Sequence, residues 1–125
     1  MTRSSRPVFL NLTQIRMPVG ALTSIGHRVT GMLLAAGVPV GVFLFDRSLQ
    51  SEQGYADVSG LLAHGAVKLA MVLVVWALAH HALAGVRHLL SDFDVGSPLR
   101  LARRSAWFVN LGGVALALMA AGVLL

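Results

Sequence analysis

The sequence predicts an all-α membrane protein with three transmembrane helices, and its composition and the lengths of its apolar stretches both support this class. Hydrophobic residues make up 56% of the 125 residues, and charged residues only 12%. Three apolar stretches each approach the roughly 20 residues that a helix needs to cross the hydrocarbon core of a bilayer. Because a soluble domain of this size could not bury three such stretches, we expect residues 1–125 to form a single multi-pass domain in a lipid bilayer.

Composition also excludes several classes of site. The chain has no cysteine, which rules out thiolate metal sites, iron–sulfur ligation and disulfides within it. Its net charge is +5, but the basic residues flank the apolar stretches, where such residues set membrane orientation. We therefore expect no nucleic-acid partner. No short apolar run with a small-residue cleavage site precedes the first apolar stretch, so we expect no signal peptide.

The first transmembrane helix is expected at about residues 19–45, and its early part carries an unusual polar stripe. Ser24, His27, Arg28 and Gly31 are spaced i, i+3, i+4 and i+7, which places them on one helix face. An ionisable group inside a membrane helix costs roughly 2.5–3.5 kcal/mol on insertion scales, so it normally faces a cavity, a partner or a ligand. Arg28 could instead extend to the membrane surface. The grouping of these polar residues favours a site.

A polar connection is expected at residues 46–60, followed by a second transmembrane helix at about 61–90. Near the end of that helix, one stripe is formed by residues spaced i, i+4, i+7 and i+11: His81, Gly85, His88 and Asp92. Its surroundings are almost wholly apolar, where imidazoles are costly unless something binds them. Three interpretations remain open, namely an axial haem ligand, a proton-conducting or transport site, and hydrogen bonds between helices alone.

The register of the stripe favours His81 over its neighbour His80 as a ligand, and His80 is expected to point toward another helix or the lipid headgroups. Gly85, one turn after His81, would leave room for a flat macrocycle. If the iron has two histidine ligands, this chain has no obvious second ligand at a matching depth. A partner subunit would then have to supply it.

The third transmembrane helix is expected at about residues 106–125, where no ionisable group occurs. The connection before it, residues 91–105, contains Pro98 and several arginines. Because basic residues gather in the N-terminal tail and in this connection, the positive-inside rule predicts a cytoplasmic N-terminus and a periplasmic C-terminus. The start of the first helix and the end of the second then lie on the same side of the membrane.

The chain resembles a known family at three places along its length. They are Arg6–Pro7, Ser24–Gly31 (SIGHRVTG) and His81–Asp92 (HALAGVRHLLSD). These blocks closely resemble the cytochrome b membrane-anchor subunit of succinate dehydrogenase (complex II), in order and at the expected separation. The resemblance covers essentially the whole chain.

This resemblance implies specific roles for residues. His81 would be an axial ligand of a haem b that is shared with a second anchor subunit, which supplies the other ligand. Ser24 and Arg28 would line a ubiquinone site near the cytoplasmic face, and His27, Arg28 and His88 would lie near the haem propionates. The quinone would receive electrons from an iron–sulfur subunit that is fed by a succinate-oxidising flavoprotein subunit.

The sequence therefore predicts a membrane subunit of succinate:quinone oxidoreductase that docks the soluble subunits but does not itself oxidise succinate. It has neither a flavin motif nor cysteines. The main alternative is the anchor of a quinol:fumarate reductase, which catalyses the reverse reaction. A haem-free anchor or transporter component is a further alternative. We expect the protein in a bacterial inner membrane.

Overall fold

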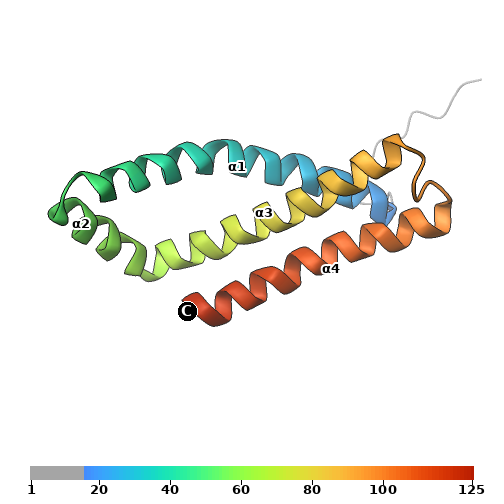
Figure 1. Ribbon diagram of the computed structural model, residues 1–125. Coiled ribbons are helices and arrows are strands. Elements are labelled where there is room, and N and C mark those ends of the chain that lie inside the picture. Colours follow the sequence, from blue (N-terminus) through green and yellow to red (C-terminus); the bar gives the residue numbers. More distant parts are fainter. Residues whose placement is uncertain (1–15) are drawn as a thin grey trace, which may run out of the picture.

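The computed structural model describes residues 16–125, and every regular element within this range is a helix (Figure 1). The Arg6–Pro7 pair lies outside the described residues. The helices are α1 (Val19–Gln50), α2 (Glu52–Ala63), α3 (Gly65–Asp92) and α4 (Leu99–Leu124). Of these, α1, α3 and α4 are long and apolar enough to cross a membrane. The predicted all-helical class with three spans is confirmed.

The polar segment expected to connect the first two spans is helical instead. Helix α1 continues through Pro39 to Gln50, and α2 occupies most of the remaining segment. Ser51 separates the two helices in an extended conformation, and its hydroxyl accepts a hydrogen bond from the Gly54 N–H at 3.0 Å. This is a helix N-cap, which satisfies one of the free N–H groups at the start of α2. The second span consequently begins at Gly65 rather than near residue 61.

The basic segment expected to connect the second and third spans is also largely helical. Helix α4 begins directly after Pro98, a residue whose missing N–H costs nothing at a helix start. The turn between α3 and α4 uses Asp94 and Gly96, both with positive φ (57° and 84°). Short polar side chains and glycine are the residues that tolerate this conformation. The arginines before residue 106 therefore lie on the first turns of α4 and not in a loop.

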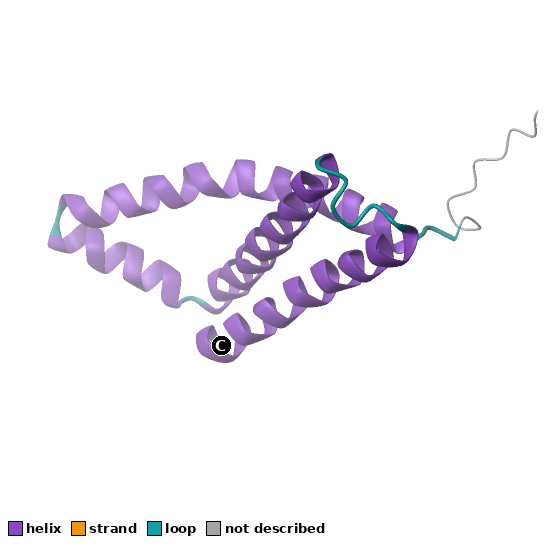
Figure 2. Cartoon of the chain, turned by 45° about the vertical axis from the view of Figure 1, so that its right-hand side comes forward, coloured by secondary structure: helices purple, strands orange, loops and turns teal. Residues whose placement is uncertain are grey.

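Helix α3 lies between α1 and α4 in both views of the chain (Figures 1 and 2). It contacts α4 most extensively and α1 next. The start of α1, the end of α3 and the start of α4 lie at one end of the bundle, and the C-terminus lies at the opposite end (Figure 1). The predicted proximity of the first span's start to the second span's end is thus present.

The interior of the described bundle is formed by small and polar side chains. The fully or nearly fully buried residues on these helices include Ala77, Ala84, Ala106, Val109, Thr23, Thr30 and His80. Small residues let membrane helices approach closely, which is how such helices gain packing energy in lipid. The large apolar side chains point outward, as expected for surfaces that face lipid or a partner helix.

Candidate functional site

Three of the predicted site residues meet where α1 and α3 pack against each other. The rings of His27 and His81 are stacked, with centroids 4.1 Å apart and an interplanar angle of 16°. The ring of His88, two turns after His81, is tilted by 46° against His27 at 5.1 Å. The imidazole of His27 therefore contacts both His81 and His88 of α3, and we call His27, His81 and His88 the histidine cluster.

The hydrogen bonds of His81 determine which ring nitrogen is free. Its Nδ1 lies 3.1 Å from the backbone oxygen of His27 and 3.4 Å from Oγ1 of Thr30. A carbonyl oxygen can only accept, so the network assigns the proton to Nδ1. Within residues 16–125, Nε2 makes no hydrogen bond. Metal-binding histidines typically have this arrangement, because donation from one nitrogen leaves the other with its lone pair and a fixed direction.

The neighbouring His80 occupies a different environment. Its side chain is only 3% exposed, and its Nε2 lies 3.1 Å from Oδ1 of Asn110 on α4. His80 thus points toward a neighbouring helix, one of the two placements that the sequence left open for it. Only His81 of the adjacent pair is partly exposed, so only His81 is accessible to a molecule outside the bundle.

Two glycines on α1 give the adjacent histidines room. A Cβ atom added at Gly26 would lie 2.7 Å from Cε1 of His80, and one at Gly31 would lie 3.1 Å from Cε1 of His81. On α3, the backbone at Gly85 faces the ring of His27, with 3.7 Å between an added Cβ and Nε2. The sequence predicted that Gly85 leaves room for a flat macrocycle. In the structure, the imidazole of His27 lies beside Gly85.

Substituting Gly26 should test this packing. His80 cannot easily move away from a new methyl group, because its own Cβ is 3.2 Å from the Cβ position of Gly113 on α4. We expect Gly26→Ala to destabilise the protein by about 1–3 kcal/mol, the usual cost of overpacking. The measurement is the thermal unfolding midpoint in mild detergent. Gly41→Ala is the matched control on α1, since nothing lies within 4 Å of its added Cβ; equal midpoints for both variants would contradict the assignment.

Ser24 and Arg28 lie one turn apart on α1, outside the histidine cluster. Arg28 is exposed and Ser24 is partly exposed. Within the described residues, neither side chain makes a hydrogen bond, and Arg28 makes no ion pair. The structure therefore does not connect these two predicted quinone-site residues to the histidines, but it leaves both accessible to a bound molecule. Asp92 is exposed at the last residue of α3.

A buried polar contact that the sequence analysis missed joins three helices. Asn110 Oδ1 on α4 lies 3.2 Å from the Thr23 hydroxyl on α1 and 3.1 Å from Nε2 of His80. Asn110 is not ionisable, so a search of the third span for ionisable residues does not find it. A lone amide within an apolar span is nevertheless a signal, because polar side chains in membrane helices hydrogen-bond across helix interfaces.

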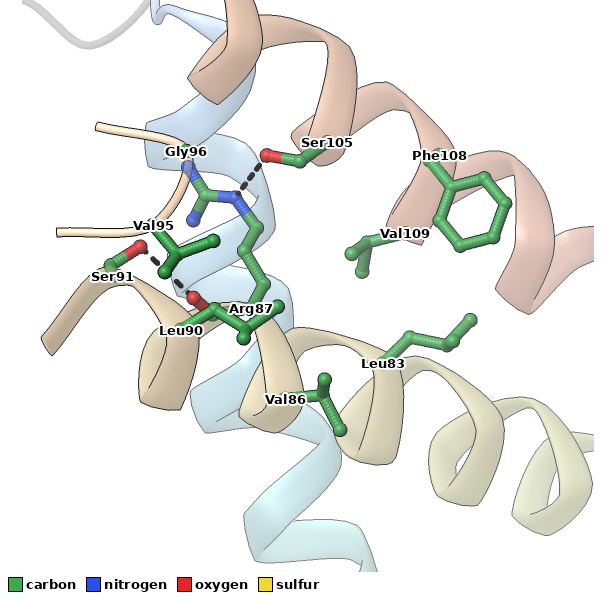
Figure 3. A pocket seen from close by; sticks show the side chains of 10 residues that line it. All are labelled: Leu83, Val86, Arg87, Leu90, Ser91, Val95, Gly96, Ser105, Phe108 and Val109. Atoms are coloured by element: carbon green, nitrogen blue, oxygen red, sulfur yellow. Dashed lines mark hydrogen bonds between the residues drawn. The ribbon is translucent and has the colours of Figure 1, made fainter. Parts of the chain in front are cut away.

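Arg87 connects the ends of α3 and α4 beside a small pocket (Figure 3). Its Nε donates to Oγ of Ser105 at 3.0 Å, and its Nη2 donates to the carbonyl of Ala102 at 3.4 Å. The pocket of about 250 Å³ is otherwise lined mostly by apolar side chains, including Leu83 and Phe108. Two N–H groups of the Arg87 guanidinium thus donate hydrogen bonds from α3 to α4. These bonds explain Arg87 as a residue that holds the two helices together.

The described residues contain no group of three or more histidine or carboxylate side chains that could hold a metal ion alone. A metal at His81 would therefore need further ligands from elsewhere. The porphyrin ring of a haem supplies four nitrogens and asks the protein for only one or two axial ligands. A single imidazole with a fixed, free Nε2 fits this requirement.

Comparison with known proteins agrees with this chemistry. Residues 2–120 match the family described as succinate dehydrogenase/fumarate reductase transmembrane subunit. The chain is 36% identical over 107 residues to the succinate dehydrogenase cytochrome b556 subunit of Coxiella burnetii, which covers 85% of this chain and 86% of the relative. It is 30% identical over 119 residues to the b556 subunit of Paracoccus denitrificans, covering 95% and 92%. It is 29% identical to the mitochondrial cytochrome b560 subunit of Mus musculus over 97% of this chain and 70% of the relative. The chain belongs to the transmembrane subunit family of succinate dehydrogenase and fumarate reductase.

Proposed function

We propose that this chain anchors a succinate:quinone oxidoreductase in the membrane, holds one side of a haem b and contributes to the ubiquinone-reduction site. The observation that carries the proposal is the hydrogen bonding of His81, whose Nδ1 is held by the His27 carbonyl while Nε2 makes no hydrogen bond to residues 16–125. The cytochrome names of the related subunits agree with a haem of the b type.

In this proposal, His81 would be the ligand that this chain supplies to the haem iron, and the haem would provide one-electron chemistry when bound. His27 and His88 flank His81 within contact distance. Together with Arg28, they provide nitrogen donors for the carboxylates of the macrocycle. Another ligand to the iron would come from a second anchor subunit, because the described histidine that faces His81 from another helix, His27, is stacked on its ring.

Ser24 and Arg28 are proposed to bind the quinone. A quinone carbonyl gains negative charge as it is reduced, and preplaced donors stabilise that charge. Arg28 supplies a permanent cation and Ser24 a neutral hydroxyl one turn away, and neither forms a hydrogen bond to another described side chain. The proton supply would come from the aqueous side near the start of α1.

The proposed orientation places the start of α1, the end of α3 and the start of α4 at the cytoplasmic face of a bacterial inner membrane. Basic residues gather at this end of the described chain: Arg16, Arg87, Arg100, Arg103 and Arg104. The opposite end has Arg47 and Lys68 beside the acidic residues of α2 and its flanks. This asymmetry favours the basic end as cytoplasmic, where the iron–sulfur and flavoprotein subunits would dock.

A quinol:fumarate reductase anchor is the second candidate, because the matching family includes the transmembrane subunits of both enzymes. The two reactions are the reverse of each other and use the same anchor chemistry. A haem-free anchor or transporter component is the third candidate.

Purification of the complex in mild detergent tests all three. We expect a flavoprotein and an iron–sulfur subunit to copurify with this chain and with a second small membrane subunit. The dithionite-reduced complex should show a b-type haem spectrum. Faster succinate oxidation with quinone than fumarate reduction with quinol supports the first candidate over the second. Copurification without haem would overturn the proposed haem site, and isolation of this chain alone would overturn the anchor role.

A further inference from the structure

The hydrogen bonds among Thr23, His80 and Asn110 have no role in the quinone or haem chemistry proposed above. One of these residues, His80, directly precedes His81 in the chain. We propose that these three residues form a clamp that sets the rotation of α3 about its axis and thereby positions His81 as a ligand. This inference rests on the proposed haem site. Thr23, His80 and Asn110 are called the clamp below.

The clamp connects all three membrane spans through one oxygen atom. Asn110 Oδ1 accepts hydrogen bonds from Nε2 of His80 at 3.1 Å and from the Thr23 hydroxyl at 3.2 Å. The Thr23 hydroxyl also lies 3.0 Å from the carbonyl of Val19, one turn earlier in α1. Thr23 has no exposed surface and His80 only 3%, whereas Asn110 is partly exposed.

The packing around His80 holds its ring in one place. The backbone of Gly26 lies against Cε1 of the ring, and Gly113 lies against Cβ. The indole of Trp76, one turn earlier on α3, is tilted against the ring at 5.7 Å. Within residues 16–125, Nδ1 of His80 has no hydrogen-bond partner, so the bond to Asn110 is the one polar contact that holds this ring there.

A rotation of α3 about its axis moves His80 and His81 together, because the two residues are consecutive in the helix. Successive side chains on an α-helix are about 100° apart, so α3 cannot turn one histidine without turning the other. With His80 held between α1 and α4, His81 faces the carbonyl of His27 and Oγ1 of Thr30. On α1, Gly26 lies against the ring of His80. His27 and Thr30 of the same helix lie against His81, so α1 contacts both histidines.

Loss of the clamp should therefore weaken the bond from His81 Nδ1 to the His27 carbonyl. Such a bond makes the imidazole a more basic ligand and favours the oxidised metal. We infer that releasing α3 raises the midpoint potential of the haem without removing the ligand. His80, Thr23 and Asn110 act through His81 and are positioning residues.

The test is a redox titration of the haem spectrum in the purified complex. Asn110→Leu removes the shared oxygen, and Thr23→Val removes one donor at constant shape. We expect both variants to retain the wild-type haem content and to show a higher midpoint potential, with the larger shift in Asn110→Leu. Thr23→Ser keeps the hydroxyl, so we expect this variant to have the wild-type midpoint potential. Ser105→Ala is the matched control, because it removes the hydrogen bond between Arg87 and Ser105 on α4 and leaves the clamp intact.

A purely structural role would lower the thermal stability of the variants and leave the potential unchanged, and this result would overturn the proposal. If Asn110→Leu does not assemble, the comparison of Thr23→Val with Thr23→Ser decides the question alone. An equal shift in Ser105→Ala would also overturn it, since any contact between α3 and α4 would then suffice. A wild-type complex without haem would overturn the proposed haem site itself. A midpoint potential that is unchanged in Asn110→Leu would overturn only the proposed role of the clamp.

Discussion

His81→Leu should remove the haem absorbance from the purified complex. Leucine has no donor atom, and the adjacent His80 cannot take over in place because it is buried and bonded to Asn110 on α4. Loss of an outer hydrogen-bond partner alone weakens metal binding by about 10–100-fold. We expect loss of the ligand itself to reach at least about 100-fold, measured as haem per complex from the reduced spectrum.

His64→Leu is the control for this prediction. His64 is exposed, precedes the first residue of α3, and lies at the end of the bundle away from the histidine cluster. It should retain the full wild-type spectrum and the same copurifying subunits. If His81→Leu retained haem while His27→Leu or His88→Leu lost it, the ligand would have to be reassigned within the cluster.

Much of the fold follows from the sequence because lipid imposes a simple rule. A backbone in hydrocarbon must satisfy its own hydrogen bonds, so long apolar stretches become helices. The three spans could be predicted on that basis. Their ends could not, because residues 46–60 and the arginines before residue 106 are polar, and polarity marks the limit of the hydrocarbon core rather than the limit of a helix. The N-cap at Ser51 and the turn at Gly96 determine those limits locally.

The histidine cluster could be predicted in part. Helical spacing places His81 and His88 on one stripe, and the common side of the membrane brings His27 near them. Spacing could not reveal that His27 lies directly on His81, because this depends on how closely α1 and α3 approach. Gly26 and Gly31 permit that approach, because a side chain at either position would meet the ring of His80 or of His81, respectively.

The role of Asn110 shows a different limit. Its partners are Thr23 and His80, which lie 87 and 30 residues away in the chain. A search for ionisable groups passes over an amide, and no local spacing connects these three positions. Only the packing of α4 against both other spans brings them together.

Arg28→Leu should lower quinone reduction by about 100-fold while leaving succinate oxidation with an artificial acceptor unchanged. Removing one preplaced donor from a site where negative charge develops typically costs about 10²–10³-fold in rate. Arg28 is exposed on α1 and has no ion-pair partner within residues 16–125. Its loss should therefore leave the packing of the bundle and the electron supply from the soluble subunits intact.

The control for this substitution is Arg47→Leu on the same helix. Arg47 lies at the opposite end of α1, where it pairs with Asp57 at 3.5 Å with both side chains about half exposed. Exposed pairs of this kind contribute little to stability, so both activities should stay near wild type. Arg28→Lys separates charge from shape, because an ammonium keeps the charge but not the planar set of donors. An equal loss of both activities in Arg28→Leu would assign this residue to assembly, and unchanged quinone reduction would remove it from the site. A selective loss that Arg28→Lys partly restores would mean that the quinone interacts with the positive charge at this position of α1.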